Sequence, residues 1–203
     1  MGYILCILMG YLLGCSNLAL LLARIKRVDL RSGGSGNPGT SNATILMGWK
    51  AGVLVGIHDI GKAWLAVFLA GALFGQLPVV REAAGIACVL GHIFPFYVRF
   101  QGGKGFASYL GMTLALNWRF ALIVMALVVL ITLITDYLVL GTFTAIAAVP
   151  VYQGIVQKSW LTAGVLLIGT GVILLRHREN ITRIRNSTEI GLRSTILEKH
   201  RVR

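Results

Sequence analysis

The sequence predicts an all-α, polytopic integral membrane protein with about seven transmembrane helices. Apolar residues make up 56% of its 203 positions and charged residues 13%. The mean hydropathy is +0.79. A soluble domain carries about a quarter of its residues as charges, because water must solvate its surface. The composition therefore excludes a soluble globular domain, and it also excludes intrinsic disorder, which goes with few large apolar side chains.

The predicted helices are apolar runs near the length of roughly 17 to 25 residues that crosses a bilayer. A single helix over 106–135 would be about 45 Å long, too long for a hydrocarbon core of about 30 Å. We therefore expect a break at Asn117. The first run has no basic leader and no cleavage site of the signal-peptide kind, so we expect it to stay as a helix. The predicted segments are 2–23, 47–74, 82–98, 106–117 (short), 119–135, 137–156 and 160–175.

The charges predict the orientation, with the N-terminus outside and the C-terminus in the cytoplasm. With that orientation, fifteen of the nineteen Lys and Arg residues fall on the inner side, as the positive-inside rule requires. The same bias accounts for the net charge of +12, so no nucleic-acid partner is expected. We expect one membrane-embedded domain over 1–203, and we expect its basic tail, 190–203, to lie on the anionic leaflet.

Three thiols, Cys6, Cys15 and Cys88, are scattered through apolar stretches without paired spacing. They indicate neither a disulfide framework nor a zinc site. Within the second predicted span, Asp59 and Lys62 are three residues apart and are expected to pair on one helix face. That pair is equally compatible with a functional site and with a structural ion pair.

The loop 33–42 is rich in glycine, serine and asparagine. Its four glycines, Gly33, Gly34, Gly36 and Gly39, tolerate left-handed backbone conformations and allow a phosphate to approach the amides closely. No Lys-Ser or Lys-Thr pair follows, so it is not a Walker loop. A flexible polar connector remains the alternative for this loop taken alone.

The loop 99–105 ends in Gly102-Gly103-Lys104-Gly105 and leads directly into an apolar segment. A lysine between glycines at a helix start adds a mobile positive charge to exposed amides, a combination suited to phosphate. The alternative is a positive-inside lysine in an ordinary turn.

The segment 176–189 follows the last predicted span. On a continuing helix, His177 and Asn180 share a face, and the histidine is suited to act as a base or a phosphate ligand at neutral pH. A solvated helix end is the alternative. All three polar segments fall on the predicted inner side, which favours a shared site.

Together the three motifs resemble the PlsY-type acyl-phosphate:glycerol-3-phosphate acyltransferases, which are small bacterial integral membrane enzymes. The resemblance runs in order from about residue 10 to residue 189. It rests on Gly-Ser-Gly-Asn-Pro-Gly at 34–39 with Asn42, Gly-His-Ile-Phe-Pro at 91–95, Gly-Gly-Lys-Gly at 102–105, His-Arg-Glu-Asn-Ile at 177–181 and Thr188-Glu189.

The resemblance implies a fatty acyl-phosphate donor, a glycerol 3-phosphate acceptor, and lysophosphatidic acid and phosphate as products. It implies a multi-pass protein of the bacterial inner membrane, in contact with membrane lipid, with its active site facing the cytoplasm and no metal or organic cofactor. Catalytic roles are expected for Ser35, Lys104, His177 and Asn180. Phosphate-binding roles are expected for Gly34, Gly36, Asn37, Gly39, Asn42, Gly102, Gly103 and Gly105.

The proposed chemistry needs no covalent intermediate, because an acyl phosphate is already activated at its carbonyl. Lys104 and the Gly34–Gly39 amides are expected to hold phosphate, and Ser35 to orient the donor. His177 with Asn180 would position or deprotonate the attacking hydroxyl, unless the substrate's own phosphate takes the proton. No histidine is followed five residues later by aspartate, so the His-x-x-x-x-Asp acyltransferase apparatus is absent.

Ile45 departs from the family pattern, which usually has an arginine at this position. The loss of a charged hydrogen bond to phosphate costs about 1.5–3 kcal/mol, unless Lys50 or another base replaces it. Two alternatives therefore stand beside the enzyme. One is a divergent paralogue that acylates another acceptor, and the other is a transporter or membrane scaffold built around Asp59 and Lys62.

Overall fold

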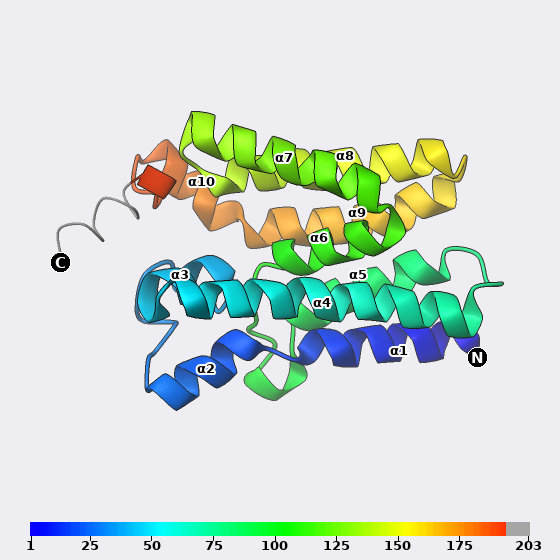
Figure 1. Ribbon diagram of the computed structural model, residues 1–203, viewed down its shortest axis with the longest axis horizontal. Coiled ribbons are helices and arrows are strands. Elements are labelled where there is room, and N and C mark those ends of the chain that lie inside the picture. The colour runs from blue at the N-terminus through cyan, green and yellow to red at the C-terminus, as the bar shows by residue number, and fades with distance from the viewer. Residues whose placement is uncertain (194–203) are drawn as a thin grey trace.

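A computed structural model describes residues 1–193, and these residues form helices and no strands (Figure 1). The predicted all-α class is confirmed. The elements are α1 (Gly2–Cys15), α2 (Leu18–Lys26), α3 (Thr40–Met47), α4 (Trp49–Phe74), α5 (Val80–Ile93), the 3₁₀ helix η1 (Phe96–Val98), α6 (Phe106–Leu116), α7 (Trp118–Thr135), α8 (Leu138–Val156), α9 (Trp160–Arg176) and α10 (Arg178–Arg185).

Within the described residues, four segments are long and apolar enough to cross a membrane, and a fifth is added if α9 and α10, bent by 45°, count as one span. The four are Gly2–Lys26, Trp49–Phe74, Trp118–Thr135 and Leu138–Val156. Helices α5 and α6 have only 14 and 11 residues. At 1.5 Å per residue they measure about 21 and 17 Å, less than the hydrocarbon core. The count of seven spans stays a prediction.

Three breaks divide the helices, and each has a local cause. The predicted span 2–23 is interrupted at Asn17, whose side chain caps α2 by accepting from Leu20 N at 3.0 Å. The predicted span 82–98 ends as an α-helix at Ile93, because Pro95 disfavours helical backbone in the residue before it. The predicted break at Asn117 is confirmed, and its side chain caps α7.

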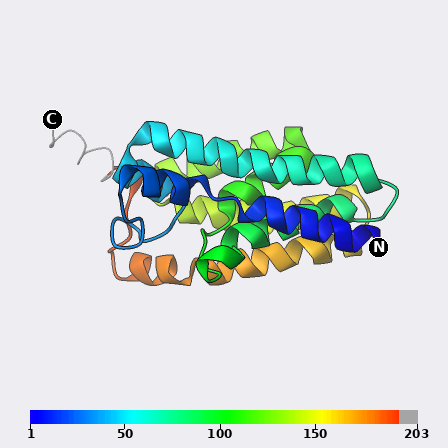
Figure 2. The same cartoon turned by 90° about the horizontal axis from the view of Figure 1, so that it is seen from below.

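The helices run roughly side by side along the long axis of the molecule (Figures 1 and 2). Helix α1 packs on α5, and α7 packs on α8. The main core lies between α5, α6, α8 and α9 and includes Tyr109, Met112, Ile146 and Leu166. Glycine allows the close approach of α1 to α5, because a β-carbon on Gly14 would lie 2.0 Å from the backbone oxygen of Cys88.

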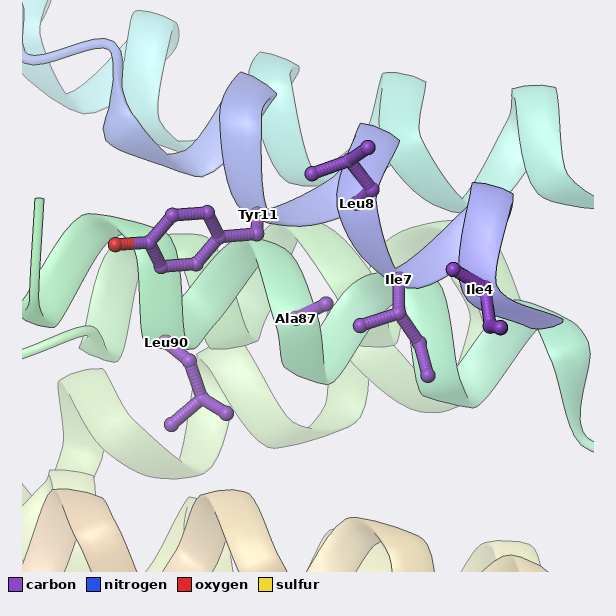
Figure 3. A pocket seen from close by; sticks show the side chains of 6 residues that line it. All are labelled: Ile4, Ile7, Leu8, Tyr11, Ala87 and Leu90. Carbon is purple, nitrogen blue, oxygen red and sulfur yellow. The ribbon is translucent and has the colours of Figure 1, made fainter. Parts of the chain in front are cut away.

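An apolar hollow of about 390 Å³ lies on the surface of the α1–α5 pair (Figure 3). Six side chains line it: Ile4, Ile7, Leu8, Tyr11, Ala87 and Leu90. The Tyr11 hydroxyl donates to Phe94 O at 2.8 Å, so its one polar atom is already paired. Such a surface offers contact to acyl chains and nothing that binds an anion.

Helices α3 and α10 lie at one end of the bundle, and the N-terminus lies at the other (Figures 1 and 2). In Figure 1, α5 ends and α6 begins near the middle of the bundle, because both helices are short. The loop 99–105 therefore reaches deeper into the bundle than the sequence-based prediction, which placed it at the inner surface.

The start of the predicted basic tail is docked on the α7–α8 turn. Leu192 N donates to Asp136 O at 2.9 Å, and Arg193 N donates to Asp136 Oδ1 at 2.7 Å. The rest of the predicted membrane-surface segment, 194–203, lies outside the described residues.

Candidate active site

A cavity of about 480 Å³ brings the three motif segments together. Each of the three contributes side chains or backbone to its lining. Of the predicted site residues, Ser35, Asn37, Gly39, Lys104, Gly105, His177 and Asn180 line it. The remaining five, Gly34, Gly36, Asn42, Gly102 and Gly103, are not among the lining residues and shape the loops behind it.

Asn42 organises the first loop from a fully buried position. Its Oδ1 accepts from Ser35 N at 2.8 Å, and its Nδ2 donates to Leu30 O at 2.7 Å and to Gly33 O at 3.3 Å. Both ends of the amide are therefore engaged within the loop. These contacts hold Ser35 at the cavity, and the phosphate-binding role expected for Asn42 stays a prediction.

Gly34 must be glycine for two independent reasons. Its φ of +57° lies in the left-handed region, and a β-carbon there would lie 2.2 Å from Asn42 Oδ1. The predicted glycine-dependent turn is present, and it serves to close the loop over Asn42.

The second loop is tied to the end of α5. Gly102 N donates to Ile93 O at 2.9 Å, and Gly103 N donates to His92 O at 3.1 Å. These two amides pair with the last carbonyls of α5 and fix the backbone that leads into Lys104. The phosphate-binding roles expected for Gly102 and Gly103 stay predictions. Gly105, with φ of +88°, is the N-cap of α6.

Two helices begin at the cavity wall. Thr40 and Ser41 are the first residues of α3, Phe106 and Ala107 are the first of α6, and all four line the cavity. The first amides of a helix have no partner within that helix, and its dipole favours negative charge there. Both ends therefore suit an anion. Sequence reasoning expected the helix start that follows Gly105 but not the one that follows Gly39.

His177 lies beyond the last residue of α9 and is buried. Its Nδ1 lies 2.8 Å from Ile173 O, a carbonyl oxygen that accepts only, so Nδ1 carries the proton and Nε2 keeps a lone pair. Burial lowers the pKa of His177 to about 4. The imidazole is therefore neutral at physiological pH and able to accept a proton.

Lys104 and Asn180 belong to one hydrogen-bonded chain. Lys104 Nζ donates to Asn180 Oδ1, and Asn180 Nδ2 donates to Glu189 Oε1 at 2.5 Å. Arg183 Nε donates to the second oxygen of Glu189 at 2.7 Å. Burial, followed by the charge of Arg183, lowers the pKa of Lys104 to about 8.

Glu189 also lines the cavity, although it was not among the predicted site residues. The sequence could have singled out Glu189, because it follows Thr188 in the third motif. The side chain fixes the amide of Asn180 so that its oxygen faces Lys104, which no spacing argument could establish.

The predicted Asp59–Lys62 pair is confirmed, with Lys62 Nζ 2.8 Å from Asp59 Oδ1. His92 of α5 joins this pair, and Asp59 and His92 both line the cavity. Among the residues that the structure describes, no group of three or more His, Cys, Asp and Glu side chains is arranged to hold a metal ion.

Ile45 lines the cavity and is 36% exposed. Lys50 does not line it; its ammonium lies over the Trp49 ring, 5.9 Å from the ring centroid. Lys50 therefore does not replace the arginine that the family pattern leads one to expect. Within the described part of the chain, Lys104 is the one lysine or arginine among the lining residues.

The chain is similar to known proteins along nearly its whole length. The family model described as Glycerol-3-phosphate acyltransferase matches residues 4–187. Glycerol-3-phosphate acyltransferase 1 of Oceanobacillus iheyensis is 32% identical over 211 residues, which cover 98% of this chain and 99% of the relative. The glycerol-3-phosphate acyltransferase of Geotalea daltonii is 36% identical over 181 residues, covering 89% and 92%.

Two solved structures share the fold. The glycerol 3-phosphate form of PlsY (YgiH), an integral membrane glycerol 3-phosphate acyltransferase, superposes with a TM-score of 0.89 at 32% identity, covering 95% of this chain and 96% of that one. Its lysophosphatidic acid form superposes with a TM-score of 0.86 at 31% identity, covering 97% and 100%.

Proposed function

Because the chain belongs to the glycerol-3-phosphate acyltransferase family, it is an integral membrane acyltransferase, and we propose that its donor is a fatty acyl phosphate and its acceptor glycerol 3-phosphate. The products are lysophosphatidic acid and inorganic phosphate, which makes the reaction a first step of phospholipid synthesis. The transporter and scaffold alternatives no longer apply to an enzyme of this family.

The observation that carries the proposal is the convergence of three distant loops on one cavity. Ser35, Lys104 and His177 lie far apart in sequence and all line it. An ammonium group and two helix starts supply the positive potential that phosphoryl groups need. Apolar side chains of the same lining, among them Leu110 and Val139, suit the acyl chain.

In the proposed reaction the acceptor hydroxyl oxygen attacks the acyl carbonyl carbon. The bond between that carbon and the phosphate oxygen breaks, and phosphate leaves with its bonding electrons. Lys104 stabilises the charge on the phosphate, and Ser35 orients the donor. His177 Nε2 takes the hydroxyl proton, because its Nδ1 already carries one. Asn180 holds Lys104 in place.

The proposed site faces the cytoplasm. It lies toward the end of the bundle where α3 and α10 gather, opposite the N-terminus (Figure 1). The same end carries Arg24, Lys26, Arg27 and the bases of α10, an excess that favours the cytoplasmic side.

A phosphate-release assay tests donor and acceptor together. Purified protein in lipid is given palmitoyl phosphate with and without glycerol 3-phosphate, and we expect release that depends on the acceptor. Lys104→Ala should reduce kcat/KM by at least about tenfold, because a charged hydrogen bond to phosphate is lost. Lys50→Ala, which removes a lysine outside the cavity, should leave it unchanged.

Release of free coenzyme A from palmitoyl coenzyme A, with no release of phosphate from palmitoyl phosphate, would refute the donor. Equal rates for Lys104→Ala and Lys50→Ala would refute the site.

A second acceptor remains a candidate because of Ile45, an apolar side chain in a cavity with a single lysine. If glycerol 3-phosphate is the acceptor, Ile45→Arg should lower its KM by about tenfold, since a charged hydrogen bond to phosphate is added. Ile45→Leu is the matched control. An unchanged KM, together with a better substrate found in a screen of other phosphorylated alcohols, would favour the second acceptor.

A further inference from the structure

The most unusual buried group beside the cavity is the cluster formed by Asp59, Lys62 and His92. Their exposed fractions are 2%, 6% and 3%. The cluster joins α4 to α5 and also reaches the break between α1 and α2, where Lys62 Nζ donates to Ser16 O at 2.7 Å. The mechanism proposed above assigns it no role.

The contacts of Lys62 determine which nitrogen of His92 carries the proton. The ammonium has three N–H groups, and its three partners are Asp59 Oδ1 at 2.8 Å, Ser16 O at 2.7 Å and His92 Nδ1 at 2.9 Å. An ammonium donates and never accepts. His92 Nδ1 also lies 3.4 Å from Asp59 Oδ1, which accepts only, but that oxygen already accepts from Lys62 at 2.8 Å, and the contact of Nδ1 with the ammonium is the shorter one. We therefore assign Nδ1 as the acceptor and place the ring proton of the neutral imidazole on Nε2.

His92 Nε2 points toward the second motif loop. A β-carbon built on Gly103 would lie 2.1 Å from His92 Nε2, closer than to the ring carbons. Glycine at 103 thus leaves room for the N–H edge of the ring, directly beside Lys104. His92 is one of the residues that line the cavity.

The charges in the cavity leave room for a further hydrogen-bond donor to a bound phosphate. The described lining residues include one ammonium group, Lys104, and two carboxylates, Asp59 and Glu189, which are paired with Lys62 and Arg183. A phosphate dianion at Lys104 is left with one cationic ligand, and a neutral N–H donor adds a hydrogen bond without further charge.

We propose that His92 is a further phosphate-binding residue of this enzyme, donating from Nε2–H to a phosphoryl oxygen held beside Lys104. Lys62 is a positioning residue that fixes this tautomer by donating to Nδ1. The inference rests on the proposed phosphate-binding function of the cavity. It predicts that His92 acts on the phosphate and not only as a tie between α4 and α5.

Two substitutions at His92 separate these roles, because each amide reaches one position of the ring. Gln places an NH₂ near Nε2, whereas Asn places a polar atom near Nδ1. For a phosphate ligand, His92→Gln should stay within about threefold of wild type in kcat/KM for acyl phosphate, and His92→Asn and His92→Phe should lose at least about tenfold. Rescue by Asn and not by Gln would overturn the proposal in favour of a structural tie.

Nitrogen NMR of histidine-labelled protein tests the proposal without any substitution of His92 in the observed sample. The His92 signals, assigned by their absence in His92→Gln, should show a protonated Nε2 and an unprotonated Nδ1. Inorganic phosphate should shift Nε2, and Lys62→Met should make the tautomer signature mixed. A protonated Nδ1, or a phosphate titration that leaves Nε2 unmoved, would overturn the proposal.

The outcomes also separate this inference from the proposed function. If Lys104→Ala loses phosphate release but His92→Phe keeps wild-type kinetics, the role of His92 is refuted and the proposed function is still supported. A wild-type enzyme that releases no phosphate would sink the proposed function, and the phosphate titration of His92 Nε2 would then decide the binding site by itself.

Discussion

Lys104 shows how burial and neighbouring charges set the pH range over which one side chain is charged. Burial and the charge of Arg183 favour the neutral amine, and together they lower its pKa from 10.5 to about 8. Asn180 accepts a hydrogen bond from it and keeps it at the cavity. The group is charged below about pH 8 and neutral above it.

This pKa predicts an alkaline limb in the pH profile. Only the protonated amine attracts phosphate, so kcat/KM should be constant from pH 6 to about pH 8 and fall as pH rises beyond it, because kcat/KM reports the free enzyme. In Lys104→Arg the guanidinium stays charged, so the limb should disappear even if the rate is lower. Initial rates of phosphate release from pH 6 to 9.5 measure both profiles. A limb that persists in Lys104→Arg contradicts the assignment.

Residue spacing predicted a contact within one helix but not the contact between two helices. The Asp59–Lys62 pair followed from a spacing of three on one helix, and it is present. The contact of Lys62 with His92 could not be read in this way, because the two residues lie on different helices, 30 positions apart. Spacing rules apply within a helix, whereas packing decides the contacts between helices.

The loop 33–42 and helix α3 act as one element. Asn42 in α3 holds the backbone of the loop, and Gly34 supplies the turn that lets it do so. The sequence predicted a glycine-dependent anion loop. It did not predict that a short helix begins inside it, because Thr40–Met47 looked like a polar connector followed by the start of a span.

Gly34→Ala tests this element. The added methyl group meets Asn42 Oδ1 and the backbone leaves its preferred region, so we expect Ser35 to be displaced and kcat/KM to fall by at least about tenfold, with a loss of about 1–3 kcal/mol in stability. Gly61→Ala, where nothing lies within 4 Å of the added carbon, should leave kcat/KM unchanged and should not lower the stability, because alanine is the better helix former within α4. Kinetics and thermal unfolding of both variants measure this. Wild-type kinetics in Gly34→Ala would show that the loop does not shape the site.

Helices α5 and α6 explain why the second motif lies deep in the bundle. The predicted apolar span continued past the end of α5 to residue 98, but Pro95 stops the helix and the chain turns back at mid-length (Figure 1). Helix α6 then starts after Gly105, close to the cavity. A short helix pair therefore carries Lys104 to the site.

At the scale of the whole molecule, the topology is open to a direct test. Single cysteines replace Ser41 and Arg178 at the motif end and Lys158 at the opposite end, in a chain whose three native cysteines are changed to serine or alanine. In sealed right-side-out vesicles, we expect a membrane-impermeant maleimide to label Lys158→Cys at once and the other two only after the vesicles are opened. Labelling of Ser41→Cys and Arg178→Cys from opposite sides would contradict a shared site.

Composition by itself determined that this chain is a helical membrane protein, because apolar surface without enough charge has no stable place in water. Its ordered motifs also pointed to the family and to the residues of the site. Only the tertiary structure decided that Asn42 and Gly102 hold the loops by hydrogen bonds, that Glu189 and His92 line the cavity, and that the start of α3 lies at its wall. The reason is that hydropathy depends on residue identity, whereas these contacts depend on how helices distant in sequence pack against one another.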